Sequence, residues 1–341
     1  MRNTSLLAAV RVAASLAAAL GASAATAEPT SYPLRIENCG QTVTFEKAPE
    51  RAVALGQNSA EVLLLLGLQD RMAATAFWPN AVLPELEEAN GQVEVLTVEF
   101  PTLESVLSKQ PDFVAAMLVT LMGPDSKVAK RADFEALGIP TYLSPSACST
   151  EQTGKDAYGS RDRLWTMDLL YREIDELSRI FDVADRGEAL IADFEAREAA
   201  LRAQFKPDAD LTFLFWFSSP SPSDDAYLGG GHGPSGYIAD VLGGRNAIAT
   251  DAEWPTLGWE GILAADPKVI VAAQVDRNRW DLDTAENKIA LLTSDPTISQ
   301  MEAVRAGRIV VMSGAAMNPS IRTLYGAEQV AEQLRTIDLS Q

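Results

Sequence analysis

The chain has a single histidine and a marked shortage of basic residues. His232 is the only imidazole among 341 residues, and 28 lysines and arginines face 47 acidic residues, for a formal net charge of −19. Bare zinc or manganese sites need several imidazole and carboxylate ligands, which one histidine cannot supply. Because nucleic acid is itself negative, the charge also disfavours it as a partner. We therefore expect neither a bare-metal site nor nucleic-acid binding, and we attribute the charge to solubility.

The usual signatures of catalysis are missing as well. The chain contains no G-x-S-x-G elbow, and a Ser-His-Asp triad would have to recruit His232 from the Gly-rich segment Gly229–Gly233. That segment lacks the lysine and the Ser/Thr of a phosphate-binding P-loop. We therefore expect no catalytic residues, no resident cofactor and no metal ligands.

Long apolar runs are absent except at the N-terminus. Arg2 and Arg11 flank the small apolar run Val12–Leu20, and Ala25-Thr-Ala27 follows it. A positive start, an apolar middle and an A-x-A end are typical of a secretory signal peptide, cleaved here after Ala27. The run is too short for a spanning helix, and no other stretch approaches 18 apolar residues. Residues 1–27 are thus expected to be removed, leaving a soluble exported protein.

Only two cysteines occur, Cys39 and Cys148. An even number of cysteines in an exported protein favours a disulfide. The closed loop would exceed 100 residues, which is worth about 4–5 kcal/mol in the chain-entropy model before any strain is subtracted. Cys39 lies too far past the cleavage site to carry a lipid anchor. The alternative is a pair of free, buried thiols.

One segment occurs twice. Leu103–Val114 is echoed by Trp259–Ile270, with Glu104 and Glu260 at the second position and a proline seven residues later in both. A carboxylate is favourable in the first turn of a helix, and the proline ends the helix before an apolar strand begins. The repeat predicts two similar α/β lobes, each with a glutamate on its surface. The alternative is two unrelated helices that share the chemistry of their first turn.

Strand and helix patterns alternate through both halves. Residues 32–45 alternate like a hairpin; strands are expected at 51–55, 72–76, 113–118, 139–143, 211–217, 269–273 and 308–312, and helices at 60–66, 127–137, 184–205, 235–242, 284–293 and 328–334. This order predicts an α/β fold with mainly parallel sheets covered on both faces. The long helix at 184–205 would cross a domain. We assign residues 28–162 to the first lobe, 163–206 to a helical segment and 207–341 to the second lobe.

The order and spacing of several segments resemble the periplasmic substrate-binding proteins of ABC importers for ferric siderophores, haem and cobalamin. These segments are Ala48–Leu55, Glu61–Leu68, Leu103–Asp112, Leu242–Asn246, Trp259–Pro267 and Ala303–Val311, and together they cover nearly the whole mature chain. The resemblance implies two Rossmann-like lobes joined by one rigid helix, which permits only small lobe movements. It also implies that Glu104 and Glu260 dock into arginine pockets of a permease dimer in the inner membrane.

A function follows from the resemblance. It implies a monomeric periplasmic protein that captures a metal chelate, a ferric siderophore above all, and delivers it to the importer. Cobalamin and haem stay open as alternatives, because aromatic and arginine side chains serve all three ligands. The alternative of another class is a siderophore-processing hydrolase.

Ligands of open α/β sheets bind beyond the carboxyl ends of the strands. That rule selects the segments 57–58, 77–78, 118–122, 216–217, 274–280 and 317–322, and with them the His232 loop and Trp254. Our candidate ligand-binding residues are Gln57, Asn58, Trp78, Trp216, His232, Trp254, Arg279 and Arg322. Aromatic rings suit a large planar ligand, and guanidinium groups suit its carboxylates.

Each of these candidates has a plainer interpretation. An aromatic side chain can belong to the core, and an arginine can form a surface ion pair, such as Arg322 with Glu328. His232 is either an axial ligand to haem iron or cobalt, or only a loop side chain.

Overall fold

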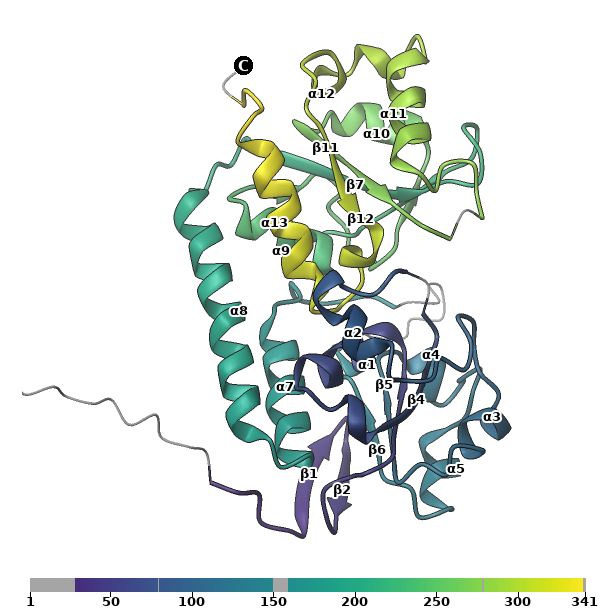
Figure 1. Ribbon diagram of the computed structural model, residues 1–341. Coiled ribbons are helices and arrows are strands. Elements are labelled where there is room, and N and C mark those ends of the chain that lie inside the picture. Colours follow the sequence, from purple (N-terminus) through teal and green to yellow (C-terminus); the bar gives the residue numbers. More distant parts are fainter. Residues whose placement is uncertain (1–27, 79, 150–158, 278, 340–341) are drawn as a thin grey trace, which may run out of the picture.

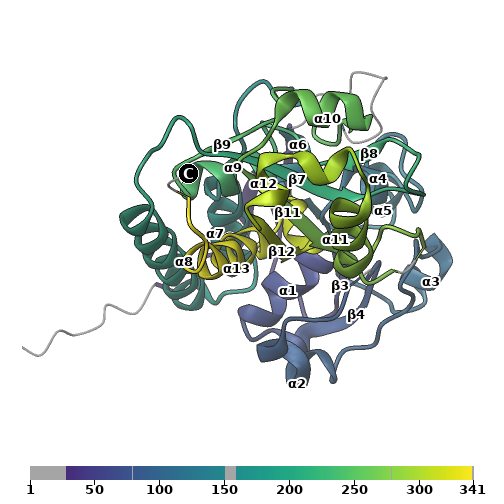
Figure 2. The same ribbon diagram turned by 90° about the horizontal axis from the view of Figure 1, so that it is seen from above.

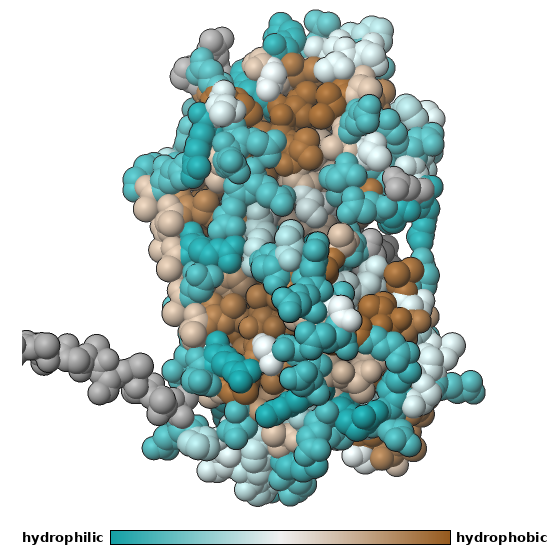
Figure 3. All heavy atoms as spheres, viewed as in Figure 1, coloured by the Kyte–Doolittle hydropathy of each residue, from teal (hydrophilic) through white to brown (hydrophobic). Residues whose placement is uncertain are grey.

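Two α/β lobes lie one above the other, and a single long helix runs along one side of both (Figure 1). The structure is a computed structural model that describes residues 28–78, 80–149, 159–277 and 279–339. The expected signal peptide, residues 1–27, lies outside the described residues. Within the described ranges, no helix combines the length and the apolar character that a membrane crossing requires. Hydrophilic residues cover most of the face in Figure 3, with separate apolar patches over both lobes.

The N-terminal lobe is built on a four-stranded parallel sheet in the order β4-β3-β5-β6. The antiparallel hairpin of β1 (Leu34–Asn38) and β2 (Gln41–Phe45) precedes it, and its strands are β3 (Ala52–Leu55), β4 (Met72–Ala76), β5 (Phe113–Ala116) and β6 (Thr141–Leu143). Every residue of β3 and β5 is buried, as the continuous apolar runs of a parallel sheet require. The helices are α1 (Gln57–Leu65), α2 (Glu87–Asn90), α3 (Leu103–Leu107), α4 (Val119–Met122), α5 (Arg131–Glu135) and α6 (Pro145–Cys148).

The C-terminal lobe contains a mixed sheet in the order β10-β8-β7-β11-β12, with β9 beside β7. The parallel strands are β7 (Thr212–Ser218), β9 (Arg245–Asn246), β11 (Val269–Gln274) and β12 (Ile309–Ser313), and the antiparallel ones are β8 (Ala226–Leu228) and β10 (Thr256–Leu257). Phe213 and Phe215 pack against one set of helices, whereas Leu214 and Trp216 pack against the other, because successive side chains of a strand alternate. The helices are α9 (Pro234–Val241), α10 (Trp259–Ala265), α11 (Ala285–Ser294), α12 (Glu302–Arg305) and α13 (Arg322–Leu334), with α9 and α13 on the side of the long helix (Figure 2).

The two lobes share a pair of packed helices, α7 (Asp168–Ile180) and α8 (Ala184–Gln204). Near the start of α8, Arg186 donates to the carbonyl of Leu66 in the N-terminal lobe, at 3.0 Å. Further along, Arg197 binds Glu328 of α13 at 2.7 Å, in the C-terminal lobe. The predicted long helix therefore contacts both lobes along its length. Because Glu328 pairs with Arg197, it is not the partner of Arg322, and that interpretation is wrong.

Cys39 and Cys148 form the predicted disulfide. Their Cα atoms lie 5.6 Å apart across a sequence separation of 109 residues. The bond ties the end of the β1–β2 hairpin to α6, so the hairpin is held against the parallel sheet.

Most predicted elements are present, but three helices differ in extent. The helix expected at 60–66 is α1, which begins three residues earlier, at Gln57. The helix expected at 127–137 is only α5, whose start is fixed because the Asp133 carboxylate accepts the backbone N–H of Lys130 at 2.8 Å. The helix expected at 328–334 begins six residues earlier, at Arg322. Arg322 therefore lies in the first turn of α13, not in a preceding turn.

Candidate ligand-binding cleft

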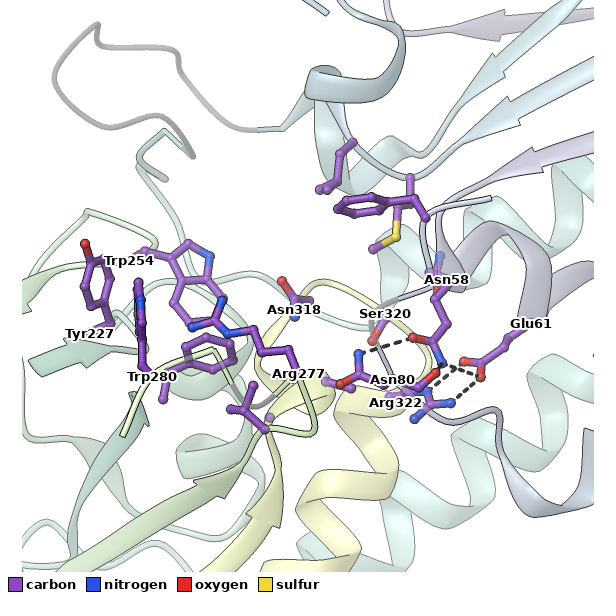
Figure 4. Close-up of a pocket in the computed structure, with 18 residues that line it drawn as sticks. Asn58, Glu61, Asn80, Tyr227, Trp254, Arg277, Trp280, Asn318, Ser320 and Arg322 are labelled. Carbon is purple, nitrogen blue, oxygen red and sulfur yellow. Dashed lines mark hydrogen bonds and ion pairs between the residues drawn. The ribbon is translucent and has the colours of Figure 1, made fainter. Parts of the chain in front are cut away.

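A cavity of about 220 Å³ lies between the lobes and is lined by residues from both (Figure 4). In the N-terminal lobe these residues follow the carboxyl ends of β3, β4 and β5. In the C-terminal lobe most of them lie at or after the ends of β7, β11 and β12, whereas Tyr227 lies in β8 and Trp254 precedes β10. Several of the segments that the sequence rule for open α/β sheets selected therefore line this cavity.

Four aromatic rings form one wall of the cavity. Phe217 and Trp254 meet edge to face with their ring centroids 4.9 Å apart, and Tyr227 lies against Trp280 at 5.0 Å. The Arg277 guanidinium lies 4.4 Å from the Trp280 ring and 5.3 Å from the Phe217 ring. Figure 4 shows Tyr227, Trp254 and Trp280 gathered on one side of the cavity, with Arg277 beside them. Such a wall offers a large apolar area for stacking.

Arg277 is held from behind by a buried carboxylate. Its Nη2 lies 3.2 Å from Oδ1 of Asp283, which is fully buried. Burial alone would raise the pKa of Asp283, but hydrogen bonds from Ser218, Arg277 and two backbone N–H groups outweigh it and hold that pKa below its ordinary value. Arg277 and Asp283 are therefore a charge pair at the base of the aromatic wall.

The opposite side of the cavity is a polar network that joins the lobes. Arg322 of α13 donates two parallel hydrogen bonds to Glu61 of α1, one of them 2.8 Å from Nε to Oε2, and a third to the Ala81 carbonyl. The Glu61 side chain is fully buried and that of Arg322 nearly so. Bidentate pairing of this kind fixes geometry as well as charge.

Asn58 extends the network in both directions. Its amide oxygen accepts the backbone N–H of Ile321 at 3.0 Å, and its amide nitrogen donates to Glu173 of α7 at 3.2 Å. Gln57 and Asn80 bond each other beside it, at 3.2 Å. Asn58 thus joins the cleft, the C-terminal lobe and α7.

Glu173 ends the network in a fully buried position. It accepts hydrogen bonds from Asn58 and, at 2.5 Å, from the Ser144 hydroxyl. Burial raises the pKa of Glu173 to about 7, and these two bonds offset only part of the effect.

The raised pKa makes stability depend on pH. Between the ordinary value of 4.5 and about 7, the folded protein keeps a proton that the unfolded chain has lost. Stability from this group is therefore full below the lower value and falls as pH rises to the upper one, by about 3 kcal/mol. In Glu173→Gln the amide oxygen can still accept from Asn58, and the amide nitrogen can donate to the Ser144 oxygen in place of the bond that Ser144 donates in wild type. This variant should gain that much over wild type in urea unfolding at about pH 8 and little at about pH 4.5. Glu188→Gln on the exposed face of α8 is the control, and an equal gain at both pH values would contradict the assignment.

Two further ion pairs lie near the cavity. Arg161 and Glu253, both nearly fully buried, lie 3.0 Å apart beside a smaller hollow that shares Trp254 and Asn318 with the cavity. Arg279 lies 3.6 Å from Glu99, and both of these side chains are exposed.

Of the eight candidate ligand-binding residues, four line the cavity: Gln57, Asn58, Trp254 and Arg322. Trp78, Trp216, His232 and Arg279 are not among the lining residues. The Arg322 guanidinium, which we expected to bind the ligand, is already paired with Glu61.

Two tryptophans are displaced from the cleft by strand geometry. Trp216 lies inside β7, is fully buried and packs edge to face on Trp259, so its neighbour Phe217 reaches the cavity instead. Trp78 is buried with its Nε1 bound to Thr75, at 2.6 Å. Phe77, at a positive φ of 64°, lines the cavity in its place.

The polar candidates outside the cavity have other partners. His232 lies on the loop before α9, with its Nδ1 2.7 Å from the carbonyl of Arg161. Arg279 faces solvent, and its neighbours Arg277 and Trp280 line the cavity. The interpretation of His232 as a loop side chain is therefore the better one.

Six lining residues lie outside the segments that the sequence rule selected: Glu61, Asn80, Met117, Tyr227, Gly314 and Ala315. Glu61 had a detectable signal, because it follows Gln57 by four residues and so shares its helix face. Tyr227 lies on the antiparallel strand β8, to which the rule for parallel strands does not apply.

The duplicated segments are structurally equivalent. Glu104 and Glu260 lie in the first turns of α3 and α10, and both side chains are exposed. Gln110 and Asp266, which precede the two prolines, both have a positive φ, at 50° and 36°. Each segment then enters a buried parallel strand, β5 or β11. The two equivalent helices, α3 and α10, thus present an exposed glutamate on each lobe; Figure 1 labels both helices.

No group of three or more histidine, cysteine, aspartate or glutamate side chains that could hold a metal ion occurs within the described ranges.

A family model described as periplasmic binding protein matches residues 53–316. The chain belongs to this family. A vitamin B12-binding protein of Vibrio parahaemolyticus is 22% identical over 304 residues, which cover 87% of this chain and 94% of the relative.

Solved structures show the same fold. A periplasmic binding protein from Veillonella parvula matches with a TM-score of 0.73 and 24% identity, over 89% of this chain and 98% of its own. An ABC-type Fe3+-hydroxamate transport system protein from Saccharomonospora viridis gives 0.67 and 25%, over 89% and 99%. A periplasmic haem-binding protein of Vibrio cholerae gives 0.60 and 18%, over 83% and 98%. These likenesses support two lobes around a cleft.

Proposed function

We propose that this protein captures a metal chelate in the periplasm and delivers it to an ABC importer of the inner membrane. The observation that carries the proposal is the interlobe cavity with its wall of four aromatic rings. The family membership and the printed ligands of the relatives, vitamin B12, Fe3+-hydroxamate and haem, support a chelate as the cargo. A ferric siderophore is the first candidate, with cobalamin or haem as alternatives in the same transporter type.

The cavity is smaller than a whole chelate. Sites for drug-sized ligands measure about 300–1,000 Å³, and this cavity measures about 220 Å³. Entry therefore requires the lobes to part at the cleft, where Tyr325 also donates to Glu85 across the lobes at 2.7 Å. Since α8 holds both lobes by ion pairs and hydrogen bonds, this opening is small.

A hydrolase is the weaker alternative. A Ser-His-Asp arrangement in the cleft needs an imidazole, and the only histidine, His232, lies outside the cavity with its Nδ1 against a backbone carbonyl. The matched family is also one of binding proteins.

Titration with a chelate, followed by tryptophan fluorescence, tests the proposal. Trp254→Ala should weaken binding about 3- to 10-fold, because a stacked ring contributes about 0.5–1.5 kcal/mol beyond its area. Trp216→Phe is the matched control, since that ring is buried behind the cavity and its loss should leave affinity unchanged. Equal affinities for wild type and Trp254→Ala would remove the aromatic wall from the binding site.

A further inference from the structure

Every arginine at or beside the cleft, within the part of the chain that the structure describes, is already paired with a carboxylate of the same chain. The pairs are Arg322 with Glu61, Arg277 with Asp283, Arg161 with Glu253 and Arg279 with Glu99. No lysine lines either hollow in the described residues. The described cleft therefore carries positive groups but no uncompensated positive charge.

These pairs are difficult to open for a ligand. Glu61 and Asp283 have fully buried side chains, and Glu253 is 5% exposed. If a ligand anion took the arginine, the displaced carboxylate would stay buried without a partner, and an uncompensated buried charge costs about 3–5 kcal/mol. Arg279 is free to move, but its pair is exposed and contributes little to binding in water.

Two neutral polar side chains in the cleft, Ser320 and Asn318, can form hydrogen bonds with a ligand. Ser320 lines the cavity, and its buried hydroxyl oxygen has no hydrogen-bond partner among the described residues. Asn318 lies between the aromatic wall and the polar network, with its amide in the cavity (Figure 4). Hydroxyl and amide groups of this kind bind amide or hydroxyl groups of an uncharged ligand.

We infer that the cleft selects a metal chelate with no net negative charge. This inference rests on the proposed function and narrows it. Three hydroxamates lose one proton each and cancel the charge of Fe3+, and a corrinoid is likewise uncharged or nearly so. Three catecholates lose two protons each and leave a threefold anion, and haem carries two carboxylates. A polyanion would meet no free cation in the described cleft, and the formal net charge of −19 would oppose its approach.

Four probes test the inference by fluorescence titration of the purified mature protein. Ferrichrome and cyanocobalamin are neutral, whereas ferric enterobactin and haemin are anionic. We expect at least one neutral probe to bind, with both anionic probes at least about tenfold weaker, which corresponds to about 1.4 kcal/mol. Binding of ferrichrome would indicate a hydroxamate site, and binding of cyanocobalamin a corrinoid site.

Adding a free cation should change the selectivity. Asn318→Lys places an ammonium at a half-buried lining position. Among the described residues, the hydrogen bonds of Asn318 run through its backbone, to Ala315 and from Thr323, so the change breaks no ion pair there. The ratio of enterobactin affinity to ferrichrome affinity should rise at least about tenfold. Asn318→Gln, without the charge, and Ala189→Lys, with the charge on the exposed face of α8, should leave that ratio unchanged.

Different results would overturn the selectivity for neutral chelates and the proposed function itself. If ferric enterobactin or haemin binds as tightly as the better neutral probe, the charge inference is wrong and chelate binding stands. An unchanged affinity ratio in folded Asn318→Lys overturns it as well. If the folded wild-type protein binds none of the four probes, the proposed function itself is wrong.

Discussion

Cells that carry the double variant Glu104→Ala/Glu260→Ala should import no chelate, although the purified variant binds it as tightly as wild type. Both carboxylates are exposed, lie in the first turn of equivalent short helices and belong to different lobes. Neither lines the cavity. Removing one partner of a desolvated, hydrogen-bonded charge pair from a protein interface costs about 2–5 kcal/mol. Two such losses together would leave no measurable docking to a permease.

We expect the two glutamates to act together, because the distance between them is nearly fixed. α8 contacts both lobes through Arg186 and Arg197, so the separation of the glutamates changes little when the lobes move. A permease dimer can then engage both lobes at once, and the second contact benefits from the first. Each single variant should accordingly retain partial uptake.

Uptake of a labelled chelate in cells that lack the native copy measures the effect. Glu188→Ala/Glu332→Ala removes two exposed glutamates from α8 and α13 and should transport normally. Normal transport by Glu104→Ala/Glu260→Ala would disprove the docking role. A collapse of affinity in that variant would instead place the two residues in the binding site.

The predictions that succeeded depend on local chemistry. The strand runs, the hairpin, the long helix and the disulfide each follow from a pattern within a short segment or from a count of residue types. The duplicated glutamate was visible for the same reason, since a helix start and a following proline are local signals.

The side of a strand on which a residue lies was harder to predict. Leu211–Phe217 was correctly read as a strand, but the strand is shifted by one residue, to Thr212–Ser218. Because side chains alternate, Trp216 enters the core and Phe217 reaches the cavity. An uninterrupted apolar run does not reveal this, since both faces of the sheet are covered.

The polar side of the cleft depends on contacts between distant segments. Glu61 and Arg322 lie 261 residues apart, and nothing near Arg322 in the sequence identifies Glu61 as its partner. The closest acidic neighbour on the same helix, Glu328, binds Arg197 instead. The sequence therefore identified an arginine of the cleft but not its partner. It suggested a free positive charge, whereas in the folded protein Arg322 is paired with Glu61.

The consequence of that pairing is the largest stability effect that we expect. Arg322→Met should lower the free energy of unfolding by about 3–5 kcal/mol, because Glu61 stays fully buried with no cation beside it. Arg322→Lys keeps the charge but cannot make the two parallel hydrogen bonds to Glu61, so its loss should be smaller, about 1–3 kcal/mol. The graded loss distinguishes a buried bidentate pair from a mere packing contact.

Urea unfolding of three variants and a control measures the pair. Arg179→Met, which breaks an exposed pair with Asp175, should cost less than about 1 kcal/mol. Arg322→Met/Glu61→Leu should recover most of the loss, because no unpaired charge remains and both replacements are apolar. A double variant as unstable as Arg322→Met would mean that the packing of α13 against the N-terminal lobe, and not the charge pair, stabilises this side of the cleft. A loss under about 1 kcal/mol in Arg322→Met would show that water reaches Glu61. An anionic ligand could then displace Glu61 from Arg322 at little cost, and the cleft would not select neutral chelates on this ground.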